Sequence, residues 1–184
     1  MLQIFSKIKQ AVKIFAAEER GVSAIEFALI APAMVAFLLG SIEVNLLLTA
    51  DRKVTQLTST IADLVAQDDV ITADEMDDIF TAASAILQPY SSAPLKMRVT
   101  SVMMDNSGNA KVAWSQGRGM IALSPGSSIS TPDGLLQANT SVIMAQVTYD
   151  YDSLIGSVVN TNIQLDDTFY LRPRRSAAVA GPAP

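Results

Sequence analysis

Paired carboxylates are the side chains that come closest to catalytic chemistry in this sequence. The chain contains no histidine and no cysteine, so it lacks the commonest general base and any thiolate. Asp150 with Asp152, and Asp166 with Asp167, have the residue type that glycosidic hydrolysis uses. Nothing nearby supplies a nucleophile or a cofactor loop, and carboxylates at strand ends are more often surface or turn residues. We therefore predict no enzyme activity, no catalytic residue and no cofactor.

A second group of carboxylates raises the question of a cation site. These acids are Asp68, Asp69, Asp74, Glu75, Asp77 and Asp78. The ligand order and central glycine of an EF-hand loop are missing, and the dipole of a helix starting after Thr72 explains several of the acids. Residues 105–109 resemble the start of a metal-ion-dependent adhesion motif, Asp-x-Ser-x-Ser, but Asn109 replaces the last serine. We predict a hairpin turn there and no metal site.

A single carboxylate, Glu26, stands at the start of a long apolar run. Residues 27–42 contain no charge, and Glu26 and Glu43 bracket them. As a helix this run spans about 24 Å, because each residue rises about 1.5 Å. The hydrocarbon core of a membrane is about 30 Å thick, so both carboxylates fall near its edges. The predicted membrane span includes Phe27, Leu29, Ile30, Pro32, Val35, Phe37, Leu38, Leu39 and Ile42.

The basic residues predict the orientation of this span. More of them precede the apolar run than closely follow it, and positive charge favours the cytoplasmic side. Those before it are Lys7, Lys9, Lys13 and Arg20, and those after it are Arg52 and Lys53. Apolar residues at helical spacing within residues 1–21 also indicate an amphipathic leader on the membrane surface.

Two simpler explanations of the apolar span are a cleaved secretory signal and an uncleaved signal anchor. An ordinary secretory signal has a shorter apolar core and is cleaved after it, whereas Gly21 precedes the apolar run here. An uncleaved signal anchor accounts for the span and the charge bias equally well. It gives no reason for Glu26, although a carboxylate within a membrane is by default a candidate functional residue. The alternative prediction is therefore an uncleaved, single-pass, membrane-anchored binding or sensor module.

The residues around Gly21 resemble a known processing signature. Residues 21–27, GVSAIEF, resemble the cleavage site of type IV prepilins, where a dedicated membrane peptidase cuts after the glycine. Residues 20–32, RGVSAIEFALIAP, are similar to the N-terminal signature of TadE-like proteins, the minor pseudopilins of bacterial tight-adherence (Tad/Flp) pilus systems. The basic leader, the Glu-Phe and Ala-Pro pairs, and Glu43 all match. The major Flp pilin is much shorter than this chain, and TadG-like proteins are often longer.

This resemblance implies how the first residues act. Cleavage after Gly21 would make Val22 the first residue and Glu26 the fifth. The ammonium group of Val22 would pair with Glu26 of a neighbouring subunit, because each charge is costly in hydrocarbon and less so when paired. Gly21 and Val22 are thus the expected processing site, and Glu26 and Phe27 the expected assembly residues.

The resemblance also implies partners and a location. The partners would be a prepilin peptidase, other pilin-like subunits, the inner-membrane pilus assembly platform and the lipid bilayer. A net charge of −5 argues against nucleic acid as a partner. We expect a minor pseudopilin that spans the bacterial inner membrane once, with a cytoplasmic N-terminus and an extracytoplasmic C-terminal domain. The sequence leaves open whether the subunit enters the pilus.

The remaining sequence predicts an α+β fold. Residues 1–21 would be the cleavable leader, 22–66 a transmembrane and stalk helix, 67–175 an extracytoplasmic α+β domain, and 176–184 a flexible tail. A capping box at Thr72–Glu75 opens a second amphipathic helix that ends before Pro89. Alternating patterns predict a small, mainly antiparallel sheet. Its strands would be residues 95–104, 110–115, 141–151 and 167–172, with a long loop at 116–139.

Two further details follow from the pattern. In the strand at 141–151 the expected inward residues are Val142, Met144 (or Ile143), Val147, Tyr149 and Tyr151. The basic segment at residues 172–175 resembles the arginine-containing end of many TadE-like chains. An arginine cluster of this kind is usually solvated, but it has the charge to meet an acidic patch on another subunit.

Overall fold

The computed structural model describes residues 20–132, 134–153 and 163–182. The chain divides into two compact units, Met1–Asn45 and Leu46–Pro184. The leader predicted at residues 1–21 lies almost entirely outside the described residues.

The first described element is the long helix α2, Arg20–Ala66, which continues through Pro32. The side chains of residues 21–49 are exposed or half-buried. Further along the helix, apolar side chains recur every three or four residues, which places them on one face. Those fully buried on this face include Ala50, Val54, Leu57, Ile61 and Val65. The long helix that the sequence predicts is confirmed, and its second half forms part of the core of the second unit.

A short helix, α3 (Ala73–Ser84), follows and continues into the 3-10 turn η1 (Ala85–Leu87). The predicted capping box opens it, since the Thr72 hydroxyl accepts a hydrogen bond from the Glu75 amide and the Glu75 carboxylate accepts one from the Thr72 amide. The Thr72 amide foremost, and the Thr72 hydroxyl at 2.9 Å, donate to the Glu75 carboxylate and hold its pKa below the usual value. Two contacts align this segment with α2: Lys53 Nζ donates to the Ile86 carbonyl at 3.0 Å, and the Tyr90 hydroxyl donates to the Leu46 carbonyl at 2.9 Å.

Four antiparallel strands form one sheet in the order β2-β1-β3-β4. They are β1 (Leu95–Met104), β2 (Ala110–Arg118), β3 (Ser141–Tyr151) and β4 (Ile163–Leu171). The α+β prediction is confirmed. The second strand continues three residues beyond the predicted end, because Gln116 and Gly117 still pair with β1. The last strand starts at Ile163 rather than Asp167, since Ile163 to Asp166 already pair with β3.

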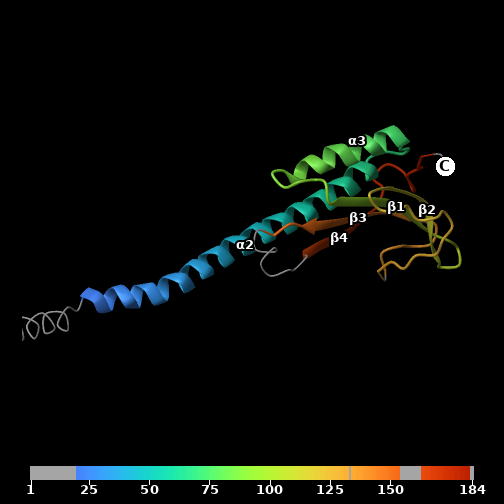
Figure 1. The fold of residues 1–184 in the computed structure, drawn as a ribbon. Helices are drawn as coiled ribbons and strands as arrows, with labels where there is room; N and C mark the ends of the chain where they lie inside the picture. Colours follow the sequence, from blue (N-terminus) through green and yellow to red (C-terminus); the bar gives the residue numbers. More distant parts are fainter. Residues whose placement is uncertain (1–19, 133, 154–162, 183–184) are drawn as a thin grey trace, which may run out of the picture. The chain divides into compact units, whose positions relative to one another are not determined.

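The sheet has two apolar faces, and the helices cover one of them (Figure 1). Odd-numbered residues of β3, from Ile143 to Tyr151, join α2 and α3 in the main core. Val142 and Met144 instead contact Leu136 in a second cluster that the long loop covers. All the predicted inward residues are buried. The alternative Ile143 lies in the main core with Val147, Tyr149 and Tyr151, whereas placing Val142 and Met144 in the same set was wrong, because successive strand residues point to opposite faces.

The end of the chain docks on the same domain. The Val179 side chain is buried, and its carbonyl accepts a hydrogen bond from Trp114 Nε1 at 2.8 Å. Ala180 exchanges two backbone hydrogen bonds with the segment that joins α2 to α3, through the Ile71 amide and the Asp69 carbonyl, each at 2.9 Å. Residues 177–181, which the sequence analysis assigned to a tail, thus act as a strap over the domain.

Candidate functional site

The predicted span forms an exposed apolar surface on α2. The helix contains a window long and apolar enough to cross a membrane, with a mean hydropathy of 2.2 and none of the window buried. Phe37 is 81% exposed and Leu29 is 75% exposed. The other predicted span residues are exposed as well, namely Phe27, Ile30, Pro32, Val35, Leu38, Leu39 and Ile42. Apolar surface of this extent is rare on a soluble monomer and marks a site for membrane or partner contact.

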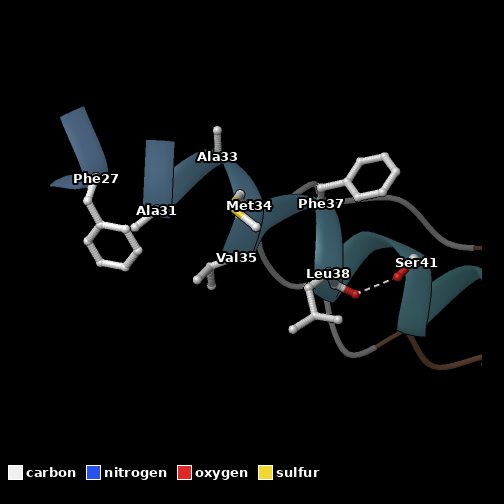
Figure 2. Close-up of a pocket in the computed structure, with 8 residues that line it drawn as sticks. All are labelled: Phe27, Ala31, Ala33, Met34, Val35, Phe37, Leu38 and Ser41. Atoms are coloured by element: carbon white, nitrogen blue, oxygen red, sulfur yellow. Dashed lines mark hydrogen bonds between the residues drawn. The ribbon is translucent and has the colours of Figure 1, made fainter. Parts of the chain in front are cut away.

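Side chains on this part of α2, drawn in Figure 2, line an open, shallow hollow of about 750 Å³. Its lining residues are Phe27, Ala31, Ala33, Met34, Val35, Phe37, Leu38 and Ser41. All of them come from one helix, so the hollow is the relief between neighbouring side chains. A lipid chain or the ridge of another helix would fill such a surface.

The polar groups at the far end of the apolar run are satisfied within the helix. The Ser41 hydroxyl donates to the Leu38 carbonyl at 2.8 Å (Figure 2), and the Asn45 side chain donates to the Ser41 carbonyl at 2.7 Å. Internal bonds of this kind let polar residues enter hydrocarbon, where water is absent. These two residues are therefore compatible with a position in or beside a membrane.

The predicted processing and assembly residues occupy the first two turns of α2. Gly21 and Val22 are the second and third residues of α2. Glu26 lies one turn beyond Val22, so the side chains of Val22 and Glu26 occupy neighbouring positions on one face. Glu26 is exposed and forms no ion pair within the described residues, and the ring of Phe27 is 70% exposed. A Cβ atom added at Gly21 would meet no atom within 4 Å.

Glu43, at the other end of the apolar run, is in a different state. Its side chain is half-buried, and neither carboxylate oxygen has a hydrogen-bond partner within the described residues. A buried carboxylate without a partner is costly when it is charged. The position of Glu43 at the end of the apolar run is visible in the sequence, whereas the lack of a hydrogen-bond partner among the described residues is seen only in the structure.

Two of the four aspartates first considered for catalysis, Asp150 and Asp166, have structural partners. Asp150 pairs with Lys96 at 3.0 Å and accepts a hydrogen bond from Gln164 Nε2 at 2.9 Å, and these contacts, that with Lys96 foremost, lower its pKa. Asp166 accepts a hydrogen bond from Thr148 across the β3–β4 pair at 2.6 Å. Asp167 Oδ1 accepts a hydrogen bond from the Thr168 amide, and its Oδ2 is buried without a partner among the described residues. Among the described residues, no group of three or more metal-ligating side chains could hold an ion.

Sequence reasoning missed a groove beside the edge strand β4. It has a volume of about 400 Å³ and lies between α2 and β4. Its lining residues are Ser59, Thr60, Asp63, Leu64, Phe169, Leu171 and Arg174. Arg174 forms an ion pair with Asp63 and donates its backbone amide to the Ala66 carbonyl. The arginine cluster was noted in the sequence, but its position beside α2 depends on the fold.

Together these features define a class of protein: a candidate single membrane span whose helix continues into an α+β domain. The TadE-like protein family model matches residues 21–63, and the resemblance inferred from the sequence is confirmed over this segment. The matched segment begins at Gly21 and contains Glu26 and Glu43. No curated protein and no solved structure matches the chain.

Proposed function

We propose that this protein is a minor pseudopilin that supports assembly of a Tad/Flp pilus from the bacterial inner membrane. A prepilin peptidase cleaves it after Gly21, and the mature chain begins at Val22. The apolar surface of α2 holds it in the membrane with the second unit outside the cytoplasm. It is a building block that contacts other pilin-like subunits and the assembly platform.

One observation carries the proposal: the family match starts at Gly21, where the exposed apolar part of α2 also begins. A peptidase that acts at a membrane surface requires its cleavage site at the start of the span, and Gly21 has this position. Cleavage also provides a cationic partner for the exposed Glu26, since it creates an ammonium group at Val22 that a neighbouring subunit can offer to it.

The test is the N-terminal residue of the protein in native membranes, measured by mass spectrometry with and without the prepilin peptidase. We expect a chain beginning at Val22 only when the peptidase is present. Gly21→Ala should abolish cleavage and pilus assembly while the protein stays folded, because the added methyl group has free space around it. Gly40→Ala is the matched control, since its methyl group is equally free and it lies within the same apolar run.

The uncleaved membrane-anchored module is the competing function. It predicts an intact leader in both strains and no effect of Gly21→Ala on the protein's activity. Finding the leader intact when the peptidase is present would refute the pilin-type pathway.

A further inference from the structure

The groove between α2 and β4 combines the apolar side chains of Leu64, Phe169 and Leu171 with polar ones that include the Arg174–Asp63 ion pair. Phe169 is 37% exposed in it, although most large apolar side chains of this domain are covered. Arg174 lines the groove, and Arg175 next to it is exposed and forms no ion pair within the described residues. Since Asp63 balances Arg174, Arg175 supplies the excess positive charge beside the groove. Such a surface suits an acidic element that also offers small apolar residues.

The outward face of α3 has that composition. Asp74, Asp78, Ala82 and Ala85 follow one another at helical spacing, and all four are exposed. The opposite face carries the buried residues Met76, Phe80 and Ala83. Asp78 forms no ion pair within the described residues. The two alanines leave room for another surface to come close beside the carboxylates.

The two surfaces lie on opposite flanks of the second unit. On the β2 side, Arg118 pairs with Asp77 of α3 and its guanidinium lies 5.5 Å from the centre of the Phe80 ring. The groove is on the β4 side, at the other edge of the sheet. One copy therefore presents α3 in one direction and the groove in the other.

Both surfaces also lie at the same level along α2. The bond from Lys53 to the Ile86 carbonyl fixes the end of the α3–η1 segment beside residue 53, and α3 runs antiparallel to α2 from its start after Ile71. Both helices rise about 1.5 Å per residue, so Asp78 lies near the level of Ile61. The α2 residues that line the groove are 59, 60, 63 and 64.

We propose that the groove binds α3 of a second copy of this chain, with Asp74 and Asp78 against Arg174 and Arg175 and the alanines over Phe169. Two copies whose second units point the same way bring these surfaces together without a shift, because both surfaces lie at one level along the part of α2 in that unit. The contact is head-to-tail and repeats from copy to copy. This inference rests on the proposed membrane placement of α2.

Membrane anchoring also makes a weak contact sufficient. Exposed ion pairs contribute little individually, and a groove of this size covers only part of a standard interface. Copies confined to a membrane have a high effective concentration. The contact should therefore form in membranes and weaken as salt increases, because salt screens exposed charges.

Cross-linking in membranes tests the geometry with the full-length chain. The protein has no cysteine, so each introduced cysteine is unique. Ser59→Cys labels the groove and Ala82→Cys labels α3. We expect a short thiol cross-linker to join one copy carrying Ser59→Cys to another carrying Ala82→Cys. Two copies with the same cysteine should join far less, and equal or stronger joining of like copies would overturn the head-to-tail contact.

Charge reversal tests the partner surfaces. Asp78→Lys or Arg175→Glu alone should reduce the cross-linked yield at least about threefold, and neither change removes an ion pair within the described residues. The two reversals should restore the yield when they are combined, because the charges are then exchanged across the contact. In this experiment the copy with Ala82→Cys also carries Asp78→Lys, and the copy with Ser59→Cys also carries Arg175→Glu. Asp51→Lys, an equal charge change at an exposed residue outside both surfaces, is the control. Unchanged yield in both single variants, or no recovery in the pair, would refute the proposal.

The same membranes separate this inference from the proposed function. The N-terminal residue and resistance to carbonate extraction report cleavage and anchoring whether or not copies cross-link. Anchored protein cleaved after Gly21 without the expected cross-link would refute the α3–groove contact and leave the pseudopilin proposal intact. Absence of cleavage and anchoring would instead refute the proposed function.

Discussion

Gly181 offers a sharp test of whether the strap is part of the fold. A Cβ atom at this position would lie 2.2 Å from Cγ and 2.3 Å from Cδ2 of Trp114. Such a distance is far inside ordinary contact, so Gly181→Ala must displace either the strap or the indole ring. Trp114 is 8% exposed and belongs to the main core, so the strap is the element expected to move.

The size of the effect follows from what the strap contributes. Its four hydrogen bonds to the domain are one from Trp114, one from the Ser141 hydroxyl to the Ala177 carbonyl, and two with Ala180. They contribute about 0.5–1.5 kcal/mol each. Burial of the Val179 side chain contributes about 1.5–3 kcal/mol. Ordering the strap backbone costs about 1 kcal/mol per residue and offsets most of this sum. We expect Gly181→Ala to reduce the free energy of unfolding by about 1–3 kcal/mol.

The assay uses the intrinsic fluorescence of the protein, which has a single tryptophan. In purified full-length protein the Gly181→Ala emission should shift to longer wavelength in native buffer, because the indole of Trp114 gains solvent. The thermal midpoint should fall by about 2–4 °C for each kcal/mol lost. Removal of residues 177–184 should reproduce both changes, and Gly40→Ala should produce neither. Native emission and an unchanged midpoint in Gly181→Ala would show that the strap does not pack on Trp114.

Two further predictions concern the same unit. Thr72→Ala removes the hydroxyl that accepts a hydrogen bond from the Glu75 amide, and it should reduce the free energy of unfolding by about 0.5–2 kcal/mol. Thr72→Ser keeps a hydroxyl and should retain most of this stability. Equal urea midpoints for the alanine variant and the parent would contradict the capping role. Hydrogen bonds and ion pairs lower the pKa of Glu75, Asp105 and Asp150, chiefly through Thr72, Asn109 and Lys96 in turn. The stability that these carboxylates contribute is therefore fully present above their unfolded-state pKa values, which are near about 4. It is lost as the pH falls through their lower folded-state pKa values. The thermal midpoint should decline over this acidic range, by a smaller amount in Lys96→Met, which removes one of the partners.

Much of the fold was predictable because local chemistry and periodicity agree. The capping residues Thr72 and Glu75 mark the start of α3 without reference to the rest of the chain. The bounds of β1 and β3 match the predicted strands, since turn residues or proline flank both of them. The apolar part of α2 was equally clear, because no charge interrupts residues 27–42.

What the sequence could not give depends on contacts between distant residues. The two apolar faces of β3 make every position from Ser141 to Ala145 buried, which removes the alternation on which a one-face assignment relies. Residues 177–181 are small and give no periodic signal, yet Trp114 and Ile71 bind them. The groove beside β4 requires Arg174 to lie next to Asp63, and these residues come together only when the domain is folded.

The extent of the family match has a physical explanation in the burial along α2. Residues 21–63 include the exposed apolar surface and also Val54, Leu57 and Ile61, which are buried against the sheet. A signature limited to the candidate membrane span would stop well before these residues. The matched segment thus combines two features, the exposed apolar surface of the candidate span and a face on which a domain can pack. The remaining residues need only supply a complementary apolar face, and many sequences can do so as long as volume and patterning are kept.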